Sequence, residues 1–82
     1  MNSIYDKQGK MIFDGDIVKG RYGRHIIVGI CKKSFDGKIS FGYYKTKKGC
    51  VELTDENFTP LRVLGNKFNP KDEDILRKVD VT

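Results

Sequence analysis

The sequence predicts a mainly β fold, built as a small barrel of about five to six short antiparallel strands with one C-terminal helix. The 82 residues predict a single domain over 1–82, because a second hydrophobic core needs a longer chain. Alanine is absent, while valine, isoleucine and threonine together number 18. β-branched residues favour strands and alanine favours helices, so this composition favours sheet. Nine glycines against two prolines predict tight turns between the strands.

Turn signals divide the chain at regular intervals. Glycine recurs beside polar residues at Asp14-Gly15, Gly20–Gly23, Asp36-Gly37 and Lys48-Gly49. The segments between these turns predict strands at Lys10–Phe13, Asp16–Lys19, His25–Lys33, Lys38–Thr46, Cys50–Thr54 and Leu61–Leu64. Short strands at this spacing are typical of a meander or a small barrel.

The turn Ser34–Lys38 is predicted to close a hairpin of two long strands, because Asp-Gly tolerates the positive φ that a tight hairpin turn needs. The second of these strands alternates, with Ile39, Phe41 and Tyr43 on one face and Lys38, Ser40, Gly42 and Tyr44 on the other. The first, His25–Cys31, is apolar on both faces. That pattern predicts a strand covered on both sides, or one whose outer face meets a second subunit.

One helix is predicted over Pro70–Val79. Asn69 can cap its N-terminus, and proline suits the first helical position. Acidic residues occupy its first turn and basic residues its last, as the helix dipole favours. The apolar stripe Ile75, Leu76 and Val79 would lie against the sheet.

Basic residues are concentrated in the middle of the chain. The formal net charge is +5, but residues 19–48 hold nine basic residues and one acid, Asp36, a net charge of +8. Residues 1–18 hold two basic and three acidic residues, net −1, and residues 49–82 hold five and seven, net −2. This asymmetry predicts an anionic partner for 19–48. The alternative is a solvated face that only promotes solubility.

Aromatic and basic residues interleave within this segment, as they do in small β-barrels that bind single-stranded nucleic acid by stacking. Tyr44 and Lys38 share the predicted outer face of their strand, and Tyr22 lies in a turn with two arginines. The predicted partner-binding surface comprises Lys19, Arg21, Tyr22, Arg24, Lys38, Tyr44, Lys45, Lys47 and Lys48. A protein-binding surface would have the same composition, so both kinds of partner remain open.

Catalysis and metal binding find little support in the sequence. His25 is the sole histidine. It could form a catalytic pair with Cys31 or Cys50 only beside a third group that orients it, and the sequence shows no motif that supplies one. The acids near the N-terminus match no metal-binding loop, and Asp14 and Asp16 are predicted to cap turns. Cys31 and Cys50 are predicted to be reduced thiols. We therefore expect no enzyme activity, no metal and no cofactor.

Two blocks of the sequence resemble a known family. Residues 5–18, YDKQGKMIFDGDIV, are similar to the Asp-Lys-x-Gly-Lys-x-Ile-aromatic-acidic-Gly-Asp-Ile-Val segment of YopX-like proteins, which are small products of phages and prophages. Residues 63–70, VLGNKFNP, are similar to the Ile-Gly-Asn-x-aromatic-x-Asn-Pro stretch of that family. The resemblance implies a small SH3-like or YopX-like barrel and no established catalytic residues.

The combined interpretation is a non-enzymatic phage or prophage accessory protein. It would bind and modulate or inhibit a host or anti-phage-defence component through the basic 19–48 surface. The alternatives are a small β-barrel that binds nucleic acid, and an oligomer that sequesters nucleotides through Arg21 and Arg24. We also expect a homo-oligomer, no membrane association, and a location in the cytoplasm of the bacterial host, because no signal peptide or membrane-spanning segment is recognisable.

Overall fold

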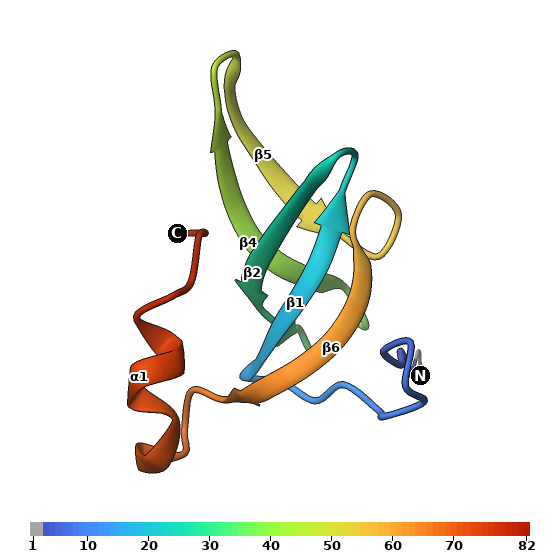
Figure 1. Cartoon of the computed structure of the whole chain (residues 1–82). Coiled ribbons are helices and arrows are strands. Elements are labelled where there is room, and N and C mark those ends of the chain that lie inside the picture. The colour runs from blue at the N-terminus through green and yellow to red at the C-terminus, as the bar shows by residue number, and fades with distance from the viewer. Residues whose placement is uncertain (1–2) are drawn as a thin grey trace.

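The computed structural model describes residues 3–82 and contains two three-stranded antiparallel sheets that enclose one core (Figure 1). The strands are β1 Asp16–Tyr22, β2 His25–Ile30, β3 Lys32–Lys33, β4 Ile39–Thr46, β5 Gly49–Thr54 and β6 Thr59–Asn66. The first sheet has the order β2-β1-β6 and the second the order β3-β4-β5. The predicted mainly β fold with a short C-terminal helix is confirmed. The two sheets keep separate edges, so the barrel is not closed.

The predicted hairpin of two long strands is wrong in one respect, because the first strand is broken at Cys31. β2 pairs with β1 in the first sheet, whereas the next two residues, Lys32 and Lys33, pair with β4 in the second. The turn Ser34–Lys38 does close a hairpin, but its first arm is only β3. The apolar pattern of His25–Cys31 gave no sign that the chain changes sheets there.

Gly29 allows the two sheets to come close at this crossing. A Cβ atom on Gly29 would lie 2.5 Å from the carbonyl oxygen of Phe41 on β4, which is closer than real Cβ atoms approach. One side of the broken strand faces the core, where Ile27 and Cys31 are both buried. Its outer side is only partly covered, and Ile26 is 48% exposed. The expected self-association of this strand stays a prediction.

The predicted faces of β4 are wrong beyond Gly42, because the strand has a bulge there. Gly42 has φ +99°, and the pairing of β4 with β5 shifts register between Ser40 and Tyr43. One extra residue in a strand moves every following side chain to the opposite face. Ile39 and Phe41 are therefore buried as predicted, but Tyr43 faces outward and Tyr44 packs against the core.

The core lies between the sheets and centres on two aromatic rings. Phe41 of β4 and Phe58, just before β6, have ring centroids 4.7 Å apart and are both fully buried. Aliphatic side chains from both sheets and from the N-terminal segment complete it: Ile12, Val18, Ile27, Ile39 and Leu53, with Cys31. Gly20 of β1 lies under the Phe58 ring, where a Cβ atom would come within 2.2 Å of Cζ. The ring therefore occupies the space that a side chain at residue 20 would need.

The N-terminal segment does not form the predicted strand at Lys10–Phe13. It makes a single bridge between Tyr5 and Met11, and the Asp6 carboxylate accepts several of the nearby amides. Asp6 accepts the amides of Gln8 and Lys10 at 2.9 Å each, and that of Val63 on β6 at 3.1 Å. Asp6 thus shapes its own turn and ties it to the edge of the first sheet.

The predicted helix begins where expected but ends early. Pro70–Asp72 form a 3₁₀ turn capped by the Asn69 side chain, and α1 covers only Glu73–Leu76. The predicted continuation to Val79 is wrong, because the chain leaves the helix to run along the sheets. There Thr82 exchanges backbone hydrogen bonds with Tyr43 of β4. None of the helices in residues 3–82 has the length and apolar character that crossing a membrane requires.

Candidate functional site

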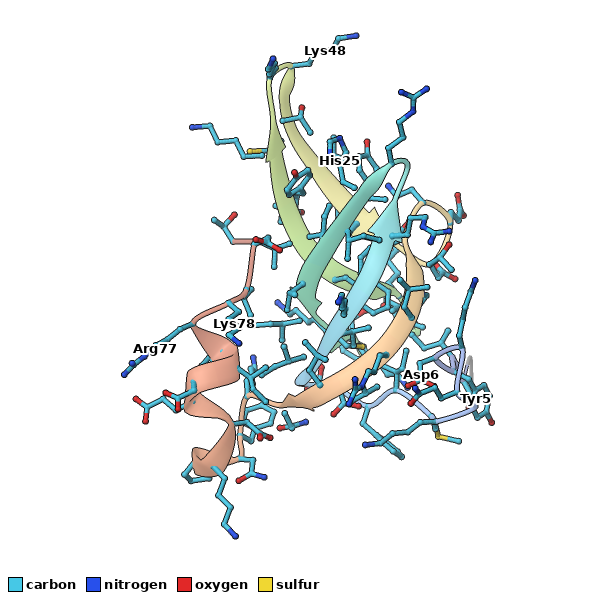
Figure 2. The ribbon with its side chains drawn as sticks, viewed as in Figure 1. Tyr5, Asp6, His25, Lys48, Arg77 and Lys78 are labelled. Atoms are coloured by element: carbon cyan, nitrogen blue, oxygen red, sulfur yellow. The ribbon has the colours of Figure 1, made fainter. Side chains whose placement is uncertain are left out.

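The first candidate site is a shallow hollow of about 570 Å³ at the end of the molecule where two hairpin turns lie near each other. One turn joins β1 to β2 and the other joins β4 to β5; Figure 2 labels His25 and Lys48 at this end. We call it the tip hollow, and it is lined by Tyr22, His25, Tyr44, Lys45, Thr46, Lys47 and Lys48. Five of these, all but His25 and Thr46, belong to the surface predicted from the sequence.

Three rings form the floor of the tip hollow. The Tyr44 ring lies edge-on to Tyr22 with centroids 6.1 Å apart, and its centroid is 6.0 Å from that of His25. Tyr22 and Tyr44 are half-buried because both also pack against the core. The prediction that Tyr44 shares an outer face with Lys38 is wrong, since the Gly42 bulge turns it inward. Tyr44 is an anchored ring beside lysines, not a freely exposed one.

The charges around the tip hollow are all of one sign. Lys45, Lys47 and Lys48 line it, no acidic residue does, and the exposed Arg24 lies in the adjacent turn. Across residues 3–82 the structure forms a single ion pair, between Arg77 and Asp74 at 3.8 Å. The lysines at the tip therefore have no carboxylate partner from the described chain, and their positive potential is directed at solvent.

The remaining predicted residues lie elsewhere. Lys19 and Arg21 point away from the core on β1, on the side opposite to Val18 and Gly20. Lys38 lines a second hollow. The sequence prediction also omitted two residues: His25, which was considered only as a catalyst, and Arg62. Arg62 lies outside the basic segment, and only its pairing with Lys19 in the sheet brings it beside the predicted cations.

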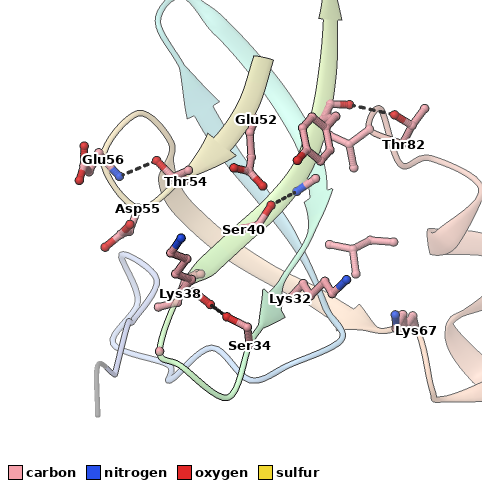
Figure 3. Close-up of a pocket in the computed structure, with 16 residues that line it drawn as sticks. Lys32, Ser34, Lys38, Ser40, Glu52, Thr54, Asp55, Glu56, Lys67 and Thr82 are labelled. Carbon is pink, nitrogen blue, oxygen red and sulfur yellow. Dashed lines mark hydrogen bonds between the residues drawn. The ribbon is translucent and has the colours of Figure 1, made fainter. Parts of the chain in front are cut away.

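The second hollow, which we call the sheet hollow, has a volume of about 820 Å³ and lies over the outer face of β4 and β5 (Figure 3). Its charged lining residues are of both signs: Lys32, Lys38 and Lys67 with Glu52, Asp55 and Glu56. Tyr43 faces Glu52 across the strands, and a side-chain hydrogen bond to that carboxylate raises the pKa of the Tyr43 hydroxyl. Because its charges offset one another, this hollow selects neither anions nor cations as a class.

The two cysteines lie in different environments, and both are free thiols. Burial raises the pKa of the Cys31 thiol to about 11, and nearby Lys33 lowers it by less. Cys50 is exposed. No group of three or more His, Cys, Asp or Glu residues that could hold a metal ion occurs in the described part of the chain.

Comparison with known proteins agrees with the motifs in the sequence. Residues 2–71 match the protein family described as YopX protein, which is most of the chain. No curated protein matches the chain, and no solved structure does.

Proposed function

Since this chain belongs to the YopX family and is a small phage-type protein, we propose that it is a non-enzymatic accessory protein. It binds a host or anti-phage-defence component and modulates or inhibits it. The contact is made by the cationic tip, which we define as the tip hollow together with Arg24.

One observation carries this proposal. The fold brings basic residues from two separate hairpins to one end of the molecule, around rings that the core holds in place. Exposed, unpaired cations contribute little to the stability of a fold, about 0–1 kcal/mol each. They do attract an anionic surface over a distance and fix its orientation. A rigid aromatic floor adds apolar contact area at a low cost in conformational entropy.

The test compares two triple variants of equal charge. The tip variant carries Arg24→Glu, Lys47→Glu and Lys48→Glu. The control carries Lys7→Glu, Lys71→Glu and Lys78→Glu, at exposed positions outside the tip hollow; Figure 2 shows Lys78 beside the helix, away from Lys48. Each protein, immobilised, is incubated with nuclease-treated lysate of a bacterial host. A protein retained by the wild type and the control, but lost by the tip variant, is the expected result. Equal retention by all three would contradict the proposal, as would equal loss by the two variants.

Nucleic acid is the second candidate partner, because aromatic rings beside lysines also suit a single strand. Its test is the binding of a single-stranded oligothymidine at increasing salt. Affinity that falls steeply with salt, and falls further in the tip variant alone, would favour nucleic acid, since neutralised phosphates release condensed counterions. Weak binding that the two triple variants reduce equally would leave the protein partner as the better explanation.

A further inference from the structure

We propose that the outer face of the β2-β1-β6 sheet docks an acidic amphipathic segment of a protein partner. The residues involved are Lys19 and Arg21 of β1, Ile26 of β2 and Arg62 of β6, which we call the outer-sheet patch. All four are exposed, and the first three alternate with the buried residues Val18, Gly20 and Ile27. The patch shares no residue with the tip hollow, although its Arg21–Ile26 pair is next to the Tyr22–His25 pair that lines the hollow. The proposal does not rest on the proposed function.

Two cations lie side by side in the patch. Lys19 is directly opposite Arg62 of β6 in the antiparallel register. Directly opposite residues on one face have Cβ atoms about 4.5–5.5 Å apart, and like charges at that spacing destabilise the sheet. Neither side chain forms an ion pair with a carboxylate of residues 3–82. An anionic oxygen placed between them would relieve the repulsion and accept charge-assisted hydrogen bonds from both.

The β2 side of the same face is apolar. Lys19 lies opposite Val28 on β2, and Arg21 lies opposite Ile26. Val28 is half-buried, and Ile26 is 48% exposed. The face is therefore cationic along β1 and β6 and apolar along β2. A segment with carboxylates on one side and apolar side chains on the other would match both halves.

The C-terminal segment covers one end of this face and leaves the patch open. Asp72 lies against Gly65, where a Cβ atom would come within 2.6 Å of its carboxyl carbon, and Gly65 pairs with Ile17 at the start of β1. Asp80 lies beside β2, where its carboxylate accepts a hydrogen bond from the amide of Val28. Figure 1 shows α1 beside the sheet and not across β1 and β6.

The composition of the patch favours protein over nucleic acid as the occupant. Proteins that bind single strands stack bases on aromatic side chains, and none of the four patch residues is aromatic. An isoleucine beside two arginines and a lysine offers apolar burial together with carboxylate recognition, and arginine pairs with carboxylates in a bidentate geometry.

The experiment uses the full chain, labelled with ¹⁵N, and a synthetic helical peptide as the probe. The peptide carries leucine at every third or fourth position and glutamate at most others. A peptide of the same composition in scrambled order, which lacks an apolar face, serves as the control. The amides of Lys19, Arg21, Ile26 and Arg62 should shift on titration, and the scrambled peptide should bind more weakly. Arg62→Glu and Ile26→Ser should each weaken binding, by about tenfold for the charge reversal.

Three outcomes distinguish docking at the patch from binding at the cationic tip, from non-specific peptide binding and from nucleic-acid binding. The tip variant Arg24→Glu, Lys47→Glu, Lys48→Glu should bind the helical peptide within about threefold of wild type, whereas a loss equal to that of Arg62→Glu would overturn the proposal. Equal binding of the helical and scrambled peptides would also overturn it. So would an oligothymidine that shifts the four patch amides at lower concentration than the peptide does. Each variant is first checked by its amide spectrum, so that unfolding is not mistaken for lost binding.

Discussion

Val28 and Asp80, which are 52 residues apart in the sequence, form a reciprocal pair at the edge of the first sheet. The Val28 amide donates to Oδ2 of Asp80 at 2.8 Å, and the Asp80 amide donates to the Val28 carbonyl at 2.8 Å. Two residues later, Thr82 exchanges backbone hydrogen bonds with Tyr43 of β4. The C-terminal residues therefore connect β2, an edge strand of the first sheet, to β4, the central strand of the second, and the two sheets do not form a closed barrel.

Removing the Asp80 carboxylate should destabilise the protein. Asp80→Ala leaves the Val28 amide without its side-chain acceptor, and a net loss of about 1 kcal/mol in the free energy of unfolding is expected. Asp74→Ala is the matched control, because its exposed ion pair with Arg77 contributes little. Urea unfolding measures both variants. Equal urea midpoints for Asp80→Ala and Asp74→Ala would show that the Asp80–Val28 pair does not stabilise the packing of the C-terminal residues.

Adding a methyl group at Gly20 should overpack the core. Gly20→Ala places a Cβ atom against the Phe58 ring, and a loss of roughly 1–3 kcal/mol in the free energy of unfolding is expected. Phe58→Leu makes room at the same place, so the two changes together should cost less than the sum of their separate effects. Lys19→Ala, at the neighbouring exposed position, should change stability little. Strict additivity in the double-mutant cycle would contradict the contact.

The Asp6 carboxylate should make stability dependent on acid pH. Burial opposes its ionisation, but the amides of Lys10, Val63 and Gln8 outweigh burial and hold the pKa of Asp6 below its ordinary value. A carboxylate with a lowered pKa in the folded state stabilises above the unfolded pKa of about 3.9, and this contribution is lost as pH falls through the folded pKa.

Asp6→Asn tests this dependence. The variant should unfold at lower temperature than wild type at neutral pH, and the difference should shrink as pH falls below about 4. Asp55→Asn, at an exposed position, is the control and should follow the wild type. An Asp6→Asn difference that stays constant from neutral to acid pH would indicate that the ionised form has no special role.

The two thiols should react at very different rates. With a pKa of about 11, Cys31 is ionised in roughly one molecule per thousand at pH 8, and it is also buried. Cys50 is exposed. An aromatic disulfide reagent should therefore modify Cys50 at least about a hundredfold faster, and Cys50→Ser should leave only the slow reaction. A fast reaction in folded Cys50→Ser would show that Cys31 is accessible.

Local chemistry in the sequence was enough to predict much of this protein. Glycine beside aspartate marked the turns, β-branched residues marked the strands, and Asn69-Pro70 marked the start of the helix. The two family motifs placed the chain in the YopX family. Clustered lysines near Tyr22 and Tyr44 predicted most of the residues that the tip hollow brings together. Each of these signals depends on residues that are neighbours along the chain.

Only the tertiary structure decided which residues share a face. The bulge at Gly42 turns Tyr43 outward and Tyr44 toward the core. The alternation of residue types in the sequence gives no sign of such a change of face. The change of sheet at Cys31 and the pairing of Lys19 with Arg62 depend on contacts between distant segments. Hydrophobic alternation specifies that a strand has an inner side, but its neighbour in the sheet is selected by the packing of the whole core.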